Sequence, residues 1–195
     1  MDIMIKQGFK GLILAGVLVS GSAAAELGYT YAEAGLAMLS ADGDQTYVGF
    51  DLRGSYLVNE NIFAFGGFRM LSDDIDYTNW HLGGGYRHAL DAKTDVWGGA
   101  SLDYQEVEAE FCAGFFGCSS ASADDTAPAL RGGIRHQLND KIEVGASARY
   151  VTGDFDYLGL TGQGRFKLQE NLSLTGEVDL QDGDFGLFGG VTYFF

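Results

Sequence analysis

The sequence predicts an all-β fold, a single closed antiparallel β-barrel that crosses a membrane with an up-and-down order of strands. Three observations predict it. Segments of alternating apolar and polar residues recur along the chain, with turn residues between them. After position 25, no apolar run is long enough for a transmembrane helix. The chain also ends on an alternating segment, Gly186 to Phe195, which reads GLFGGVTYFF.

This last segment favours a strand that meets lipid on one side. One of its faces carries Leu187, Gly189, Val191, Tyr193 and Phe195. A soluble domain that stopped on such an uncovered apolar strand would expose an aggregation-prone edge. In a bilayer, however, the apolar face contacts lipid and the edge pairs with the first strand. Closure is required there, because an unpaired backbone group in lipid costs several kcal/mol.

This segment, in which alternating apolar residues are followed by a terminal Phe, resembles the last strand of bacterial outer-membrane β-barrels. In pattern, the chain is similar to the small barrels of the OmpA/OmpX type, in the porin-like superfamily. The resemblance implies that Val191, Tyr193 and Phe195 form the signal read by the barrel assembly machinery. It further implies the outer membrane of a Gram-negative cell, with outer-membrane lipid and lipopolysaccharide as neighbours.

Residues 1–25 have the features of a cleaved secretory signal peptide. Lys6 and Lys10 precede an apolar core, Gly11 to Gly21, that is too short to span a membrane. An A-x-A site follows at Ala23 to Ala25. The alternative is a signal anchor that is retained. With cleavage, the barrel domain comprises residues 26–195 and lies in an oxidising compartment.

Ten segments are expected to be strands: 27–39, 46–58, 61–71, 78–88, 94–105, 127–138, 141–152, 158–168, 171–181 and 186–195. Each is close to the ~9–11 residues that a tilted strand needs to cross a membrane. The first and sixth alternate less regularly, and Pro128 opens the sixth, so eight strands are the alternative. A soluble β-sandwich would also alternate, but the signal peptide and Phe195 disfavour it.

Charged residues occupy the polar phase of these strands. The predicted lumen network consists of Glu33, Asp51, Arg53, Arg69, Arg87, Asp103, Arg131, Arg135, Glu143, Arg149, Arg165, Lys167, Glu177 and Asp179, with Asp95 as a further acid. On the lipid face an Arg would cost ~2–4 kcal/mol at mid-depth. Acidic and basic residues are nearly equal in number in this set, which predicts an interior filled by ion pairs rather than a wide pore.

Counting residues from each turn gives the expected partners. These are Glu33–Arg53, Asp51–Arg69, Arg87–Asp95, Arg135–Glu143–Lys167 and Arg165–Glu177. Four of the predicted turns are short and resemble one another, which places them on one rim, the periplasmic one.

The opposite rim is acidic. Its five predicted connections, 40–45, 72–77, 106–126, 153–157 and 182–185, hold fourteen Asp and Glu and no Lys or Arg. One interpretation is turn chemistry, because Asp-Gly pairs suit hairpins and charge keeps loops solvated. The other is a ring that gathers divalent cations or a basic partner. No connection has the full spacing of a calcium loop, and no metal site is predicted.

The longest predicted connection contains the only cysteines, Cys112 and Cys118. In an exported protein this spacing predicts a disulfide, since other soft ligands for a metal are lacking nearby. Phe115 and Phe116 lie between them. They are expected to fold over the barrel mouth, and the alternative is contact with a receptor.

No active site is predicted. His81 is expected inside the barrel, His88 and His136 fall at periplasmic turns, and Ser101 and Ser147 point inward. Neither a protease-type acid–His group nor a lipid-facing Ser–His pair results. We therefore expect no enzyme, no cofactor and no nucleic-acid partner. A largely plugged barrel with a structural or surface-interaction role is predicted, and the alternative is a narrow channel for small solutes or cations.

Overall fold

The computed structural model describes residues 27–41, 45–73, 75–112 and 118–195. The strands are β1 (Tyr31–Ala41), β2 (Gln45–Leu57), β3 (Ile62–Ser72), β4 (Ile75–Asp91), β5 (Thr94–Cys112), β6 (Cys118–Asn139), β7 (Ile142–Val151), β8 (Tyr157–Gln169), β9 (Leu172–Gln181) and β10 (Asp184–Phe194). The predicted signal peptide, Glu26, Asp42, Asp44, Asp74, Phe115 and Phe116 lie outside the described residues.

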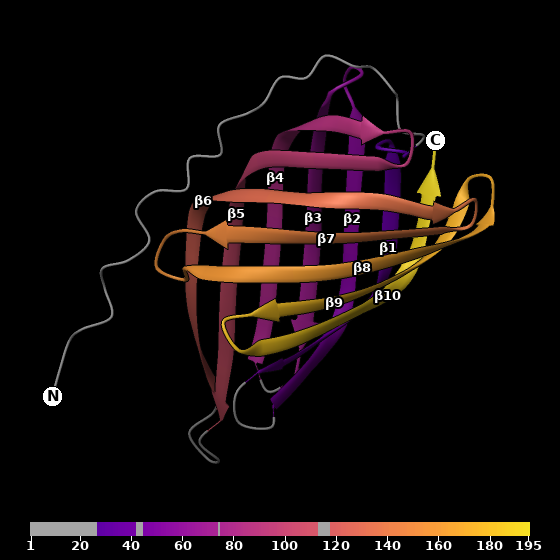
Figure 1. Ribbon diagram of the computed structural model, residues 1–195. Helices are drawn as coiled ribbons and strands as arrows, with labels where there is room; N and C mark the ends of the chain where they lie inside the picture. The colour runs from indigo at the N-terminus through magenta and orange to yellow at the C-terminus, as the bar shows by residue number, and fades with distance from the viewer. Residues whose placement is uncertain (1–26, 42–44, 74, 113–117) are drawn as a thin grey trace, which may run out of the picture.

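The ten strands form one closed antiparallel barrel (Figure 1). Each strand pairs with its neighbours in the sequence, and β1 closes the ring on β10. The predicted ten-stranded up-and-down barrel is confirmed, and the eight-stranded alternative is wrong. The less regular first and sixth segments are strands because closure requires a partner on both of their edges.

The strands are strongly tilted. From Ser40 of β1, the directly paired residues can be followed through β10, β9 and the other strands to Ile62 of β3, and then back to the first strand at the level of Gly28. The end of this path lies twelve residues from its start. Such a stagger goes with a tilt of roughly 35–45° to the barrel axis. In Figure 1, β6 to β9 in front consequently cross β2 to β4 behind at a steep angle.

The outer surface is an apolar belt. Leu36, Leu82 and Leu130 are 69%, 66% and 65% exposed, which is the arrangement expected of side chains that meet lipid. Aromatic residues border the belt. Tyr56, Tyr86 and Phe195 lie at the end with the short turns, which the sequence predicts to be periplasmic, and Trp80 stacks on Tyr104 at the end predicted to be extracellular. None of the described residues belongs to a helix with the length and apolar character of a membrane span.

Inside the barrel, large rings lie against glycine backbone. The ring of Phe188 sits where a Cβ on Gly35 or on Gly190 would come within 2.7 Å of it. The ring of Phe63 occupies the equivalent space at Gly85, where a Cβ would lie 2.5 Å from it. Glycine is therefore needed at these inward positions, because a side chain would leave no room for the ring.

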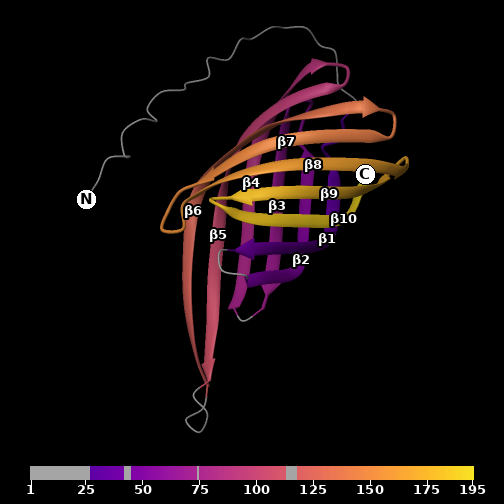
Figure 2. The same cartoon turned by 60° about the horizontal axis from the view of Figure 1, so that its bottom comes forward.

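The β5–β6 hairpin projects beyond the other strands (Figure 2). The ladder between these strands continues from Thr94–His136 to Cys112–Cys118, so the expected connection 106–126 is wrong over most of its length. The alternation continues beyond the lipid, because Glu106 and Glu108 lie on the same, outward side of β5 as Leu102 and Tyr104. The change from apolar to acidic residues marks the end of the membrane, not the end of the strand.

The first described residues also differ from expectation. A strand from residue 27 was predicted, but β1 begins at Tyr31, and residues 27–30 form no strand. Leu27 and Tyr29 are buried against Phe63 instead. Both are apolar or amphipathic and lie in the inward phase, so the segment buries them by crossing the lumen rather than by extending the wall.

Candidate functional site in the barrel lumen

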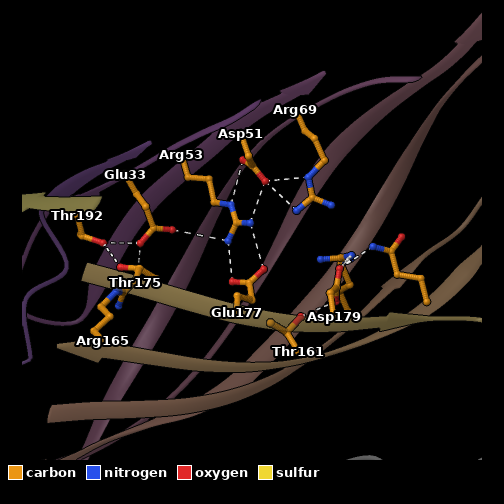
Figure 3. Close-up of polar contacts among 12 residues, drawn as sticks. Glu33, Asp51, Arg53, Arg69, Thr161, Arg165, Thr175, Glu177, Asp179 and Thr192 are labelled. Atoms are coloured by element: carbon orange, nitrogen blue, oxygen red, sulfur yellow. Dashed lines mark hydrogen bonds and ion pairs between the residues drawn. The ribbon is translucent and has the colours of Figure 1, made fainter. Parts of the chain in front are cut away.

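The centre of the lumen is an ionic network (Figure 3). Arg53 of β2 contacts Asp51 at 2.8 Å and Glu177 of β9 at 2.7 Å, with Glu33 of β1 at 3.7 Å. Asp51 also accepts a hydrogen bond from Arg69 of β3. The two bonds that Arg53 makes to each carboxylate use its planar fork, which fixes orientation as well as charge.

A second group of ion pairs lies toward the periplasmic end. Glu143 of β7 is shared by Arg135 at 2.8 Å and Arg165 at 3.1 Å. Arg165 also contacts Glu33 at 3.2 Å, which joins this group to the central one. Glu33 accepts a further hydrogen bond from Thr192 of β10 at 2.6 Å. The network therefore ties together strands on both sides of the closure.

Two more pairs lie toward the extracellular end. Arg131 contacts Asp103, and Arg149 contacts Asp179. Each carboxylate also accepts a bond from a hydroxyl, Ser101 for Asp103 and Thr161 for Asp179. Arg131 of β6 and Arg149 of β7 are direct cross-strand partners. Two like charges in that relation repel, so each arginine depends on its acid.

The expected partners are met only in part. The structure brings together Glu33 with Arg53 at 3.7 Å, Asp51 with Arg69, Arg87 with Asp95 at 3.3 Å, and Arg135 with Glu143. Arg165 turns to Glu33 and Glu143, whereas Glu177 contacts Arg53. Lys167 is exposed at the periplasmic end and, among the described residues, takes no part in the ion pairs. Strand tilt explains the difference, because it brings residues of non-adjacent strands face to face.

The periplasmic end of the lumen is crossed by residues 27–30. The Tyr29 ring lies between two guanidinium groups, with Arg135 at 4.5 Å and Arg87 at 5.0 Å from its centroid. The same arginines donate hydrogen bonds to the carbonyls of Leu27 and Gly28. Cation–π contacts and backbone hydrogen bonds together hold the segment across the opening. In the sequence, only the inward phase of Tyr29 signalled this role.

The space that remains in the lumen is divided among small cavities. A central one of about 160 Å³ has Arg53, His81, Arg131 and Arg149 in its lining. These four side chains also line a cavity of about 80 Å³, whose lining includes Tyr77 and Tyr157. A third cavity of about 320 Å³ shares those two tyrosines and reaches Asp182 and Asp184 at the extracellular end.

The remaining candidate residues serve structural contacts. His81 faces Phe65, with 6.2 Å between ring centroids, and His136 Nδ1 lies 2.8 Å from the Thr94 hydroxyl. In the part of the chain that the structure describes, no three His, Cys, Asp or Glu side chains converge on a metal position. The backbone ladder ends by pairing Cys112 with Cys118, and their side chains lie outside the described set.

Similarity to solved structures agrees with the closed ladder and the apolar belt. The translocator domain of the autotransporter NalP from Neisseria meningitidis superposes with a TM-score of 0.52 and 11% identity, over 87% of this chain and 90% of that one. The fold is that of an outer-membrane β-barrel. The apolar belt between two aromatic borders accordingly lies in the outer membrane.

Other outer-membrane barrels are similar at lower scores. The KdgM porin matches with a TM-score of 0.48 and 13% identity, over 84% of this chain and 99% of that one. Ail, the attachment invasion locus protein of Yersinia pestis, matches with a TM-score of 0.46 and 16% identity, over 85% and 99%. No protein-family model and no curated protein matches the sequence. These low identities bear on the fold alone.

Proposed function

We propose that this barrel is largely closed and that its role is structural or one of surface interaction, without catalysis. The observation that carries the proposal is the ionic network, in which pairs such as Arg53–Glu177 and Arg165–Glu33 span the lumen between non-adjacent strands. A conducting pore of this width would need those side chains to lie along the wall. Paired across the lumen, they take up the space that an ion would use.

The energetic cost of opening supports the same proposal. Removing one partner from a buried pair costs about 3–5 kcal/mol, because the other charge stays buried without compensation. The segment at residues 27–30 adds a second obstruction at the periplasmic end, where Arg87 and Arg135 hold it. Passage would require both the pairs and this segment to move.

The surface role rests on the projecting hairpin. It carries Glu106, Glu108 and Asp124, and the chain has no Lys or Arg between Lys93 and Arg131. A basic partner is the complement of such a surface, and divalent cations would link it to the phosphates of lipopolysaccharide. The barrel assembly machinery is the partner proposed for Val191, Tyr193 and Phe195 of the C-terminal segment during biogenesis.

A narrow channel is the second candidate. The observation in its favour is the succession of cavities from Asp182 and Asp184 to the centre, because neighbouring cavities share their lining residues. Such a succession would become a path for small solutes or cations if the shared side chains moved aside.

Planar-bilayer recording on the purified barrel separates the two. The wild type is expected to conduct little or nothing. The double variant Arg69→Ala, Arg149→Ala removes two long side chains and leaves Asp51 and Asp179 less compensated. Its conductance is expected to rise with a preference for cations, and that preference should fade at 1 M salt, where the Debye length is about 3 Å.

The matched control is Arg69→Lys, Arg149→Lys, which keeps the charges and most of the side-chain volume. It is expected to stay nearly as silent as the wild type. Steady, sizeable current through the wild type would overturn the closed barrel and favour the channel.

A further inference from the structure

The central cavity is lined by two kinds of side chain. Its lining includes aromatic rings from β3 and β5, namely Phe63, Phe65 and Trp97. It also includes guanidinium groups from β6, β7 and β8, namely Arg131, Arg149 and Arg165. The two kinds of side chain meet where the Arg131 guanidinium lies over the Phe65 ring, 5.6 Å from its centroid. A space bounded by both rings and cations matches a molecule with a flat apolar body and a negative group.

The groups that face the cavity are mainly cationic. Five arginines line it, Arg53, Arg131, Arg135, Arg149 and Arg165, against the two carboxylates Glu33 and Glu177. Four further acids, Asp51, Asp103, Glu143 and Asp179, pair with these arginines without lining the cavity. The cross-strand pair Arg131–Arg149 concentrates positive charge at one level. Among the described residues, the hydrogen bonds of both arginines use Nε and Nη2. Nη1 of each is left as a donor for a further acceptor.

Three buried polar atoms of the lining residues lack a partner within the described chain. They are Tyr29 Oη, Ser55 Oγ and Arg165 Nε, whose residues are 4%, 8% and 5% exposed. Leaving a buried donor or acceptor without a hydrogen bond is costly, so native proteins supply a partner from protein, water or ligand. Here three such atoms belong to residues that line the same cavity, independently of the number of arginines in its lining.

We propose that the central cavity binds a small aromatic carboxylate of about one ring. The ring lies against Phe65 and Trp97, and Arg131 and Arg149 donate hydrogen bonds to the carboxylate. The size is suitable: a cavity of about 150 Å³ in an unrelated protein admits benzene, and this one measures about 160 Å³. A carboxylate between the two arginines also offsets the repulsion of their cross-strand pairing.

The ligand enters from the extracellular end. The cavities of about 320 Å³ and 80 Å³ lead from Asp182 toward the centre and share lining residues at each step. On the periplasmic side, a cavity of about 200 Å³ beside Leu27 and Gly28 shares only Arg165 with the central one. The cavity of about 80 Å³ shares four lining residues with the central one, so the wider approach is from the outside. The site depends on the cavity itself and not on whether the barrel conducts.

Trp97 provides the measurement, since the chain has only two tryptophans and the other, Trp80, lies on the outer belt. The Trp80→Phe variant leaves Trp97 as the sole reporter. Its emission is expected to change saturably as benzoate is added to the folded barrel in detergent. Benzamide, the neutral isostere, should bind at least roughly tenfold more weakly, because it loses the charge-assisted hydrogen bonds.

Two adjacent positions give a matched pair of variants in the Trp80→Phe background. Ser147→Leu adds volume inside the cavity, whereas Ala148→Leu adds the same side chain on the exposed lipid face. Heat-modified gel mobility verifies that each barrel is folded. Ser147→Leu should abolish the benzoate response, and Ala148→Leu should retain it. Gly145→Leu, at another lining position, replaces Ser147→Leu if that variant does not assemble.

The proposal is overturned if benzoate gives no saturable response, or if benzamide gives an equal one. It is also overturned if a folded, cavity-filled variant responds like its control, in which case the cavity holds water only. Should neither filled variant assemble, the comparison of benzoate with benzamide decides alone. Binding without current would support this site and the closed barrel together, whereas binding with a steady current would support this site alone.

Discussion

The inward-facing residues fill the lumen in two different ways. On β3 to β5, the rings of Phe63 and Phe65 lie over glycine backbone, at Gly85 and Gly83, and Trp97 packs edge-on against Phe63. On β1, β2, β8 and β9, the same inward phase carries ion pairs such as Arg53–Glu177. The first region depends on matching volumes, and the second on matching charges. The two should therefore respond to substitution by different rules.

The largest effect is expected in the ionic region. Glu33→Ala takes a carboxylate from Arg165 at 3.2 Å and from Arg53 at 3.7 Å, and a hydrogen-bond acceptor from Thr192. The free energy of unfolding should fall by about 3–5 kcal/mol, because buried charges lose compensation. Urea unfolding in lipid vesicles measures it.

Glu60→Ala is the control for this substitution. Glu60 lies in an exposed turn, so the change in unfolding free energy should stay within about 0.5 kcal/mol. If Glu33→Ala were as mild as Glu60→Ala, the ionic region would not contribute to stability by pairing.

A smaller effect is expected in the aromatic region. At Gly85, a Cβ would lie 2.5 Å from the Phe63 ring, so Gly85→Ala should destabilise the barrel by about 1–3 kcal/mol through overpacking. Phe63→Leu removes part of the ring volume. The double variant should therefore lose less stability than the sum of the two single variants, and a double-mutant cycle measures the coupling.

The neighbouring Gly84→Ala is the matched control. It faces outward, and the nearest atom to its Cβ would be the Phe63 carbonyl oxygen at 3.7 Å. Little change in stability is expected there. Strict additivity of Gly85→Ala and Phe63→Leu would contradict a region governed by volume.

The smallest effect is expected outside the lumen altogether, at the end of the projecting hairpin. A Cys112–Cys118 disulfide closes so small a loop that reduction should cost at most roughly 2 kcal/mol. The barrel should keep its heat-modified mobility after reduction. Non-reducing mass mapping of exported protein is expected to find the two cysteines linked, and free thiols would refute it.

Alternation predicted much of this fold. Ten strands, their phase and their order follow from it, because a lipid face and a polar interior impose a period of two on every strand. The extension of β5 and β6 did not follow, since Glu106 and Glu108 carry the signature of a solvated loop even though they continue a ladder. Charged residues on the outward side of a strand show that water surrounds that part of the strand. They do not show that the strand ends there.

The lumen was predictable in kind and not in detail. The inward phase of Arg53 and Glu177 can be read from the sequence, but their contact depends on the stagger of the whole ring. The aromatic region did leave a signal in the sequence, and that signal does not involve charge. Phe63 and Phe65 face inward on their strand, and Gly83 and Gly85 face inward on the next. Each phenylalanine is therefore paired with a glycine.

The cross-lumen pairs also bear on the kinetics of assembly. Arg53 and Glu177 are 124 residues apart in the chain, and Arg165 and Glu33 are 132 apart. Neither pair can form until β1 meets β10, so these contacts belong to the last stage of closure. Interactions absent from the transition state affect mainly the unfolding rate. The network consequently slows the unfolding of the closed barrel. Weakening it should raise the unfolding rate and leave the folding rate almost unchanged.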